Sequence, residues 1–247
     1  MSSQLVILRH GQSTWNDLNL FTGWHDVELT EAGAAEAAKS GLTMKNEGFV
    51  FDVVHTSLLL RAVHTANLAL GAMGQLWLPA KRSWRLNERH YGDLQGKNKK
   101  ETTDQFGADQ VKLWRRSYDV PPPPVADDSL EHPRHDPRYA RLAPDVLPAT
   151  ECLKDVVNRV LPYFYDEIVP DLRAGLKVLV VAHGNSLRAL LKHLEGVSDD
   201  DIAEVNIPTA APKLYELDGD MKMTSTRYLG DADAIARAAE AVAKQAG

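Results

Sequence analysis

Two segments of this chain place a histidine and a glycine at the end of a run of aliphatic residues, in the first segment after one intervening arginine. One His-Gly pair follows residues 5–8 at His10, and the other follows residues 178–181 and Ala182 at His183. Unbroken apolar runs are typical of strands buried in a parallel sheet, where ligands bind beyond the carboxyl ends of the strands. A lone histidine at such a place is usually structural, but the repeat predicts that two imidazoles meet at one edge of a sheet. A neutral imidazole can accept a phosphoryl group, so we expect phosphoryl chemistry there.

Two arginines could neutralise the oxygens of a phosphoryl group. Arg9 precedes His10, and Arg61 falls in the first turn of a helix expected from residue 57. A cation there opposes the helix macrodipole, so an anion ligand explains Arg61 better than a solvated helix face does. The guanidinium group also binds phosphate oxygens in a fork geometry that lysine cannot offer.

A carboxylate and a second basic cluster could complete such a site. From the residues alone, Glu88 between Arg89 and His90 is explained equally well by an exposed ion pair and by general acid–base catalysis. Arg115 and Arg116 are adjacent in a chain whose net charge is −6, and they would repel each other without a polyanion nearby. The sequence therefore indicates a local anion site in an acidic protein.

The composition is typical of one soluble globular domain. The chain has 247 residues, of which 44% are hydrophobic and 25% charged, which is enough for one sizeable core. The negative charge and the lack of a basic run argue against a nucleic-acid partner. Because Cys152 is the only cysteine, no intramolecular disulfide is possible. No apolar run suits a signal peptide or a membrane span, so we expect a cytoplasmic protein that binds no membrane.

Two segments resemble metal ligands without requiring a metal. His132 and His135 share a proline-rich loop, and three aspartates at 199–201 follow Ser198. A solvated histidine pair explains the first, and a capped helix start with acids at its positive end explains the second. We therefore expect no metal.

The candidate site residues are expected to be positioned by a three-layer α/β fold, with a mostly parallel sheet of about six strands flanked by helices. Strands are expected at residues 5–8, 51–56, 76–80 and 177–182, with a hairpin at 213–217 and 221–226. Helices are expected at 31–47, from 57 onward, at 103–114, at 150–165 with a bend at Pro162, and at 187–194.

Two stretches of the chain lie outside this series of strands and helices. Eight of the 13 prolines lie between residues 121 and 148, so residues 97–148 are expected to form a long lid-like insertion over the sheet. Residues 230–247 form an Ala-rich tail that is helical, frayed or a mobile flap, and we expect it to shield the site from water. The whole chain, 1–247, is expected to be a single domain with these two additions.

The candidate residues lie in segments that, taken in order, resemble the cofactor-dependent phosphoglycerate mutases of the histidine phosphatase superfamily. The segments are residues 9–16, 21–24, 56–62, 86–92, 114–119 and 182–188. An Arg-His-Gly triplet alone marks only the superfamily, whereas this set in this order is specific to the mutase branch.

The resemblance implies interconversion of 3-phosphoglycerate and 2-phosphoglycerate, with 2,3-bisphosphoglycerate as primer and intermediate and no metal. It implies that His10 carries the phosphoryl group, that His183, Arg9 and Arg61 stabilise its transfer, and that Glu88 is the general acid–base. It implies a substrate site made of Ser13, Asn16, Thr22, Gly23, Tyr91, Lys99, Arg115, Arg116, Gly184 and Asn185. It also suggests a homodimer or homotetramer whose partners are small phosphoglycerates.

The sequence leaves alternative functions open, and it departs from the family pattern at two positions. A bisphosphoglycerate synthase or phosphatase could use the same site, although Ser13 argues against the synthase and the match around Arg115 argues against a generic phosphatase. A silent phosphate-binding or scaffolding protein would be expected to lack His10 or Glu88. Gln12 stands where many relatives have Glu, and Ala210 stands where Gly is usual, which puts the local backbone near the tail in question.

Overall fold

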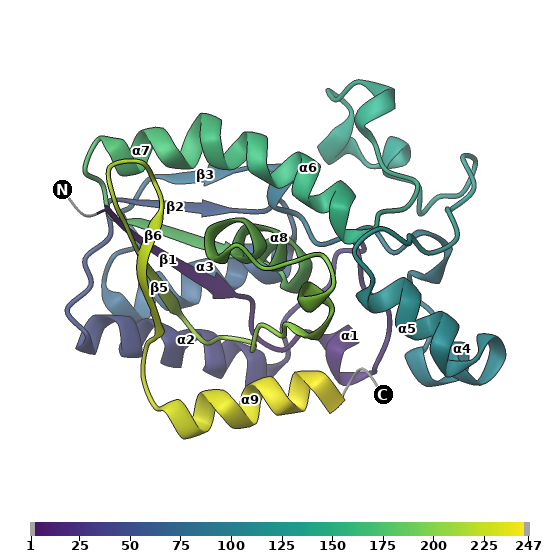
Figure 1. Ribbon diagram of the computed structural model, residues 1–247, viewed down its shortest axis with the longest axis horizontal. Helices are drawn as coiled ribbons and strands as arrows, with labels where there is room; N and C mark the ends of the chain where they lie inside the picture. Colours follow the sequence, from purple (N-terminus) through teal and green to yellow (C-terminus); the bar gives the residue numbers. More distant parts are fainter. Residues whose placement is uncertain (1–2, 245–247) are drawn as a thin grey trace.

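The computed structural model describes residues 3–244, which form a six-stranded sheet with helices on both faces (Figure 1). The strand order is β3-β2-β4-β1-β5-β6. Strands β3, β2, β4 and β1 are parallel to one another, β5 is antiparallel to β1, and β6 is antiparallel to β5. The strands are β1 (Ser3–Arg9), β2 (Val53–Thr56), β3 (Ala80–Arg82), β4 (Val178–Ala182), β5 (Lys213–Leu217) and β6 (Met223–Tyr228). The predicted mostly parallel sheet of about six strands is confirmed.

The two apolar runs that precede the His-Gly pairs form the centre of the sheet. Strands β1 and β4 are neighbours, and Arg9 pairs with Ala182 at their carboxyl ends. His10 and His183 therefore leave the sheet side by side. Every residue of β4 is buried, because helices cover both of its faces.

Two hydrophobic cores hold the layers together. On one face, Val6, Leu8 and Val181 pack with residues of α2 (Glu31–Asn46) and α3 (Leu60–Met73). On the other face, strand residues such as Ile7 and Val180 pack with residues of three further helices, α6 (Leu153–Tyr163), α7 (Val169–Arg173) and α8 (Gly184–Glu195). Alternate residues of β1 thus serve opposite cores, as the period of a strand requires, and the predicted three layers are confirmed.

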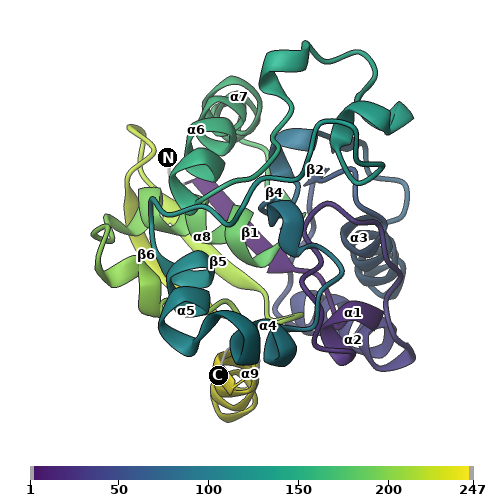
Figure 2. The same cartoon turned by 90° about the vertical axis from the view of Figure 1, so that its right-hand side faces the viewer.

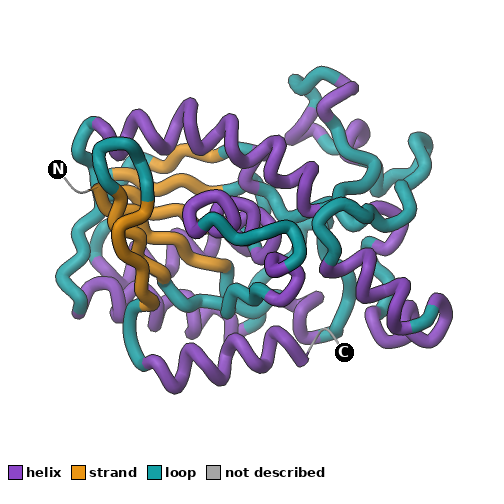
Figure 3. The backbone as a smooth tube through the Cα atoms, in the orientation of Figure 1, coloured by secondary structure: helices purple, strands orange, loops and turns teal. Residues whose placement is uncertain are grey.

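The remaining helices are short or lie outside the layers. They are α1 (Thr14–Asp17), α4 (Lys99–Phe106), α5 (Ala108–Arg116) and α9 (Ala232–Lys244). The 3-10 turns span Trp84–Leu86, Gly92–Leu94, Pro133–His135, Pro137–Tyr139, Pro144–Val146 and Asp201–Glu204. Figure 3 shows that loops, drawn in teal, make up much of the molecule beyond the sheet.

Three predicted boundaries are wrong for identifiable reasons. The single helix expected at 103–114 is two helices, because Gly107 takes a φ of 85° and interrupts the backbone pattern. The strand expected at 76–80 begins only at Ala80, and Leu76 and Trp77 lie exposed before it. The helix that contains Pro162 does not stop near 165, because a π-helical turn, Phe164–Ile168, joins it to α7.

The long insertion lies at the carboxyl ends of the parallel strands. Figure 2 looks onto this end of the molecule and shows the chain from α4 to the proline-rich turns arranged around it. Helix α9 continues from β6, and the final residues of the predicted tail, 245–247, lie outside the described residues. Among residues 3–244, none of the helices is long and apolar enough to cross a membrane.

A contact between two glycines sets how closely α2 approaches the first His-Gly turn. A Cβ on Gly33 would lie 2.0 Å from the carbonyl oxygen of Gln12, and a Cβ on Gly11 would lie 2.2 Å from the carbonyl oxygen of Gly33. Both distances are shorter than any Cβ contact can be, so a side chain at either position would separate the two backbones.

We expect Gly33→Ala to lower the free energy of unfolding by roughly 1–3 kcal/mol, the usual cost of overpacking. This loss should exceed the gain of about 1 kcal/mol in helix propensity. Gly219→Ala is the matched control, because nothing lies within 4 Å of its added methyl group. Urea unfolding measures both variants. A Gly33→Ala protein as stable as wild type would contradict the close approach.

Candidate active site

A cavity opens at the carboxyl ends of β1 and β4, and it collects most of the residues predicted for the site. Of the fifteen predicted residues, thirteen line it: Arg9, His10, Asn16, Thr22, Gly23, Arg61, Glu88, Tyr91, Lys99, Arg115, Arg116, Gly184 and Asn185. The other two, Ser13 and His183, are fully buried beside it. Ser13 caps α1, with its hydroxyl accepting from the backbone N–H of Asn16.

The imidazole of His10 is held in one tautomer. Its Nδ1 lies 2.7 Å from the carbonyl oxygen of Gly11, and because a carbonyl can only accept, Nδ1 carries the proton. Nε2 then holds the free lone pair. Burial lowers the pKa of His10 well below its ordinary value, and the charges of Arg61 and Arg9 lower it further. The ring is therefore neutral, and the lone pair of Nε2 is free, as a nucleophile would require.

His183 lies beside His10, with 5.0 Å between the ring centroids. Its Nε2 is 2.8 Å from the hydroxyl oxygen of Ser57, while its Nδ1 is buried with no hydrogen-bond partner among the described residues. Burial, and then the charge of Arg61, lower its pKa well below the ordinary value. Ser57 was missed from the sequence, although it lies in the segment 56–62 that also carries Arg61.

The two arginines flank the histidines and are themselves anchored by carbonyl groups. Arg9 donates from Nη1 to the carbonyl of Ile207 at 2.7 Å. Arg61 is 1% exposed, and burial lowers its pKa to about 10 while the charge of Glu88 opposes that change. In both side chains the Nε group is buried without a hydrogen-bond partner in the described part of the chain. Such donors fit an anion between them.

Glu88 is not an exposed ion pair. Its side chain is 8% exposed, and Oε1 accepts from the backbone N–H groups of Arg89 at 2.7 Å and Asn185 at 3.0 Å. The guanidinium of Arg89 points elsewhere and donates to the carbonyls of Trp114 and Arg115. Of the two explanations open at the sequence level, the geometry thus favours a functional carboxylate at the cavity wall.

Helices α4 and α5 contribute a second set of charged side chains to the cavity lining. Burial, followed by the charge of Arg115, lowers the pKa of Lys99 to about 8. Burial would raise the pKa of Tyr91, but the charges of Arg89 and Arg115 outweigh it and lower the value to about 8. The cavity therefore has two sets of cationic side chains, which we call its cationic poles: Arg9 and Arg61 come from β1 and α3, and Lys99, Arg115 and Arg116 come from α4 and α5, within a chain of net charge −6.

Arg188 is a cavity residue that was not predicted for the site. It is 5% exposed and donates from Nη1 to the side-chain oxygen of Asn185 at 2.9 Å, which turns the Asn185 amide nitrogen toward Tyr91. Burial lowers the pKa of Arg188 to about 9. The signal for it was present, because it ends the segment 182–188 that follows the second His-Gly pair.

The two departures noted in the sequence have different structural consequences. Ala210 has a φ of 51°, so the concern about a missing glycine is confirmed. The strained turn is held by hydrogen bonds from the Ala210 N–H to the carbonyl of Arg9 and from Ser40 to the Ala210 carbonyl. Gln12 accepts at its side-chain oxygen from the hydroxyl of Thr30 at 2.8 Å, so it helps to hold the start of α2.

Polar atoms that lack partners indicate what the cavity holds. Besides Arg9 and Arg61, three lining residues have buried polar atoms without hydrogen bonds in the described structure, namely Thr22, Arg188 and Asn206. Most of these atoms are donors, which fits an oxygen-rich anion such as a bisphosphate. Within residues 3–244, no group of three or more His, Cys, Asp or Glu side chains could hold a metal ion. His132 instead caps a turn, its Nδ1 accepting from the N–H of Arg134.

Comparison with known proteins agrees with this geometry. The family model of the histidine phosphatase superfamily (branch 1) matches residues 5–135 and 126–227. A protein of Streptomyces avermitilis named 2,3-bisphosphoglycerate-dependent phosphoglycerate mutase is 59% identical over 98% of this chain and 96% of its own length. A protein of the same name from a Nocardioides species is 59% identical over 99% of both chains.

A solved structure shows the same fold at low sequence identity. The structure titled mycobacterial hydrolase 1 has a TM-score of 0.69, with 22% identity over 92% of this chain and 97% of that chain. At this identity the likeness supports the fold only, whereas the two full-length relatives carry the family assignment. The chain therefore belongs to branch 1 of the histidine phosphatase superfamily and, within it, to the family of 2,3-bisphosphoglycerate-dependent phosphoglycerate mutases.

Proposed function

We propose that this protein interconverts 3-phosphoglycerate and 2-phosphoglycerate in glycolysis and gluconeogenesis, through a phosphoryl group carried on His10. The observation that carries the proposal is the neutral, buried His10 in a cavity with two cationic poles. A phosphoglycerate is anionic at both ends, so one end can meet Arg9 and Arg61 while the other meets Lys99, Arg115 and Arg116. The names of the two full-length relatives support the same substrate class.

The geometry suggests how each residue acts. When bound, 2,3-bisphosphoglycerate supplies the phosphoryl group. Nε2 of His10 forms the new N–P bond as the O–P bond breaks, and the Nδ1–H···O=C bond to Gly11 stabilises the charge that develops on the ring. Arg9, Arg61 and His183 face the transferring oxygens, in the role that metal ions fill in kinases. We therefore propose that no metal takes part.

Glu88 is proposed to move the proton. It donates to the alkoxide as the substrate oxygen leaves phosphorus, and accepts the hydroxyl proton when that oxygen attacks phosphohistidine in the reverse direction. Oε1 is held by two backbone N–H groups, which fixes the carboxylate at the wall of the cavity. Tyr91, Asn185, Gly184, Asn16, Thr22 and Gly23 would position the rest of the substrate, while Ser13 supports Asn16.

Two rival activities on this site remain to be separated by experiment. A bisphosphoglycerate synthase would release 2,3-bisphosphoglycerate, and a phosphatase would release inorganic phosphate. The second cationic pole favours the mutase over the phosphatase, because a phosphatase need only bind the phosphate that it removes.

We further infer a cytoplasmic homo-oligomer, either a dimer or a tetramer. Leu76 and Trp77 are 64% and 70% exposed, and they lie beside β3, which is an edge of the sheet. An apolar patch next to an open edge suits a second copy of the chain. Light scattering of the purified protein measures the state, and a monomer at micromolar concentration would contradict the inference.

Phosphorus NMR of 3-phosphoglycerate incubated with the enzyme tests the proposed function. With catalytic 2,3-bisphosphoglycerate and excess EDTA, we expect 2-phosphoglycerate to appear, and we expect His10→Ala to abolish it. Inorganic phosphate as the main product would identify a phosphatase. A loss of activity in EDTA that manganese restores would contradict the metal-free mechanism.

Glu88→Gln should lower kcat by roughly 10²–10⁴-fold, the usual contribution of general acid–base catalysis. The amide keeps the shape and an acceptor oxygen for the two N–H groups, so the fold should be unchanged. Glu101→Gln, on the exposed surface of α4, is the control. A kcat within about threefold of wild type would remove Glu88 from the mechanism.

Removal of residues 231–247 should lower mutase turnover while hydrolysis of 2,3-bisphosphoglycerate stays level or rises. A mutase must keep water away from phosphohistidine while the substrate reorients, and the tail is rich in small residues and is terminal. Phosphorylation of His10 should survive the deletion. If the ratio of 2-phosphoglycerate to phosphate does not change, closure belongs to the insertion, residues 97–148.

A further inference from the structure

The position of the Arg61 guanidinium depends on a loop that has no regular structure of its own. Arg61 donates from Nη1 to the carbonyl oxygen of His25 at 3.0 Å and from Nη2 to that of Gly23 at 2.8 Å. Residues 22–26 belong to neither a helix nor a strand. Among the described residues Arg61 has no carboxylate in hydrogen-bonding contact, so these two carbonyls hold the guanidinium that lines the cavity and whose Nε is left unpaired.

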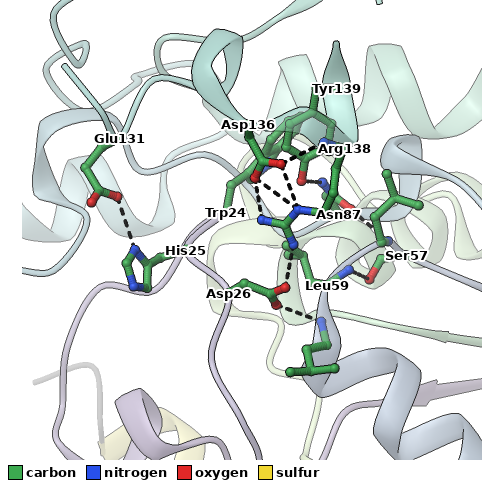
Figure 4. A network of polar contacts seen from close by, with 12 residues as sticks. Trp24, His25, Asp26, Ser57, Leu59, Asn87, Glu131, Asp136, Arg138 and Tyr139 are labelled. Atoms are coloured by element: carbon green, nitrogen blue, oxygen red, sulfur yellow. Dashed lines mark hydrogen bonds and ion pairs between the residues drawn. The ribbon is translucent and has the colours of Figure 1, made fainter. Parts of the chain in front are cut away.

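Asp26 fixes this loop at two points. Its Oδ1 accepts from the backbone N–H of Leu60 at 2.7 Å, and its Oδ2 pairs with the guanidinium of Arg138. The first contact caps α3, whose own N-cap residue, Leu59, provides no side-chain cap. Figure 4 shows Asp26 between the start of α3 and Arg138 of the long insertion.

Arg138 is held in turn by its neighbours in the insertion. Its Nε donates to both carboxylate oxygens of Asp136 at 3.0 Å. The hydroxyl of the adjacent Tyr139, which is 2% exposed, accepts from the side-chain amide of Asn87 at 2.8 Å. Figure 4 shows Asn87 and Asp26 both in contact with the stretch 136–139 of the insertion. Because Asn87 precedes Glu88 in the chain, this stretch contacts the loop that holds Arg61 and also the residue next to Glu88.

We propose that the ion pair between Asp26 and Arg138 is a positioning device, through which the insertion fixes the carbonyl groups that aim Arg61 at the transferring phosphoryl group. The proposal rests on the role given to Arg61 in the proposed function. It assigns Asp26 and Arg138 no contact with the substrate, and it gives the segment 136–139 a function beyond covering the site.

The contribution of this pair to stability should be small and its contribution to rate large. The side chains of Arg138 and Asp26 are 29% and 31% exposed, and ion pairs in contact with solvent add little to folding. A displacement of a catalytic group by about 1 Å can cost about 10² in rate. The two effects can therefore be separated.

Arg138→Met is expected to lower kcat by roughly tenfold or more, with a much smaller change in KM and a melting temperature close to that of wild type. Arg138→Lys should recover part of the loss, because it restores the charge. Arg134→Met is the matched control, since Arg134 lies in the same insertion and pairs only with the exposed Asp127 in the described structure. Asp26→Asn is the second variant, because its amide oxygen can still cap α3, and it decides the question if Arg138→Met fails to fold.

A double-mutant cycle shows whether the effect passes through Arg61. In an Arg61→Lys background, Arg138→Met should lower kcat by less than about threefold further, because the group that it positions is already gone. An equal loss in both backgrounds, or a kcat of Arg138→Met within about threefold of wild type, would overturn the proposal.

Orthovanadate binding separates this proposal from the proposed function. Vanadate is an oxyanion that reports on Arg9 and Arg61 without turnover. Calorimetry should show roughly tenfold weaker vanadate binding to Arg138→Met than to wild type or Arg134→Met, a change of about 1.4 kcal/mol. This result would support the positioning role even if no mutase activity were found, and unchanged vanadate affinity would count against it.

Discussion

The hydrogen bond from Nδ1–H of His10 to the carbonyl of Gly11 is the interaction on which the site depends. It fixes the tautomer, so that the lone pair of Nε2 faces the cavity. It needs the Gly11 carbonyl in one place, and the close packing of Gly11 on Gly33 keeps it there. The position of α2, the turn after β1 and the imidazole of His10 therefore depend on one another. Burial and two guanidinium groups then keep the ring neutral.

The concentration of buried positive charge is the second constraint. Burial lowers the pKa of Arg9, Arg61, Arg115 and Arg188 and of Lys99, which means that each charged form is less stable here than in water. A bound polyanion stabilises the charged forms. The free energy that folding loses by burying these cations is therefore recovered as affinity for the substrate and as stabilisation of the transferring group. An acidic protein can thus hold a strongly anionic substrate in this cavity.

The sequence was enough to predict the sheet and most of the site because both depend on short local patterns. The runs before His10 and His183 were predicted as buried strands of one sheet whose His-Gly turns meet at the same edge, and the structure adds that these strands are neighbours. What it could not give depends on contacts between distant residues: that Ser57 bonds His183, that Arg188 turns Asn185, and that Arg138 reaches Asp26. Gly107 is a different case, since this glycine is visible in the sequence inside the predicted helix, and its φ of 85° divides that helix in two.

The protonation state of His10 can be measured directly by recording its ¹⁵N chemical shifts in the resting enzyme as the pH is lowered. The structure predicts a neutral ring with the proton on Nδ1 that persists as the pH falls well below 6.5, the ordinary pKa of histidine, because burial and the charges of Arg61 and Arg9 depress the folded pKa. A ring that becomes protonated near 6.5, or that carries its neutral proton on Nε2, would contradict the account of His10 as a buried neutral nucleophile.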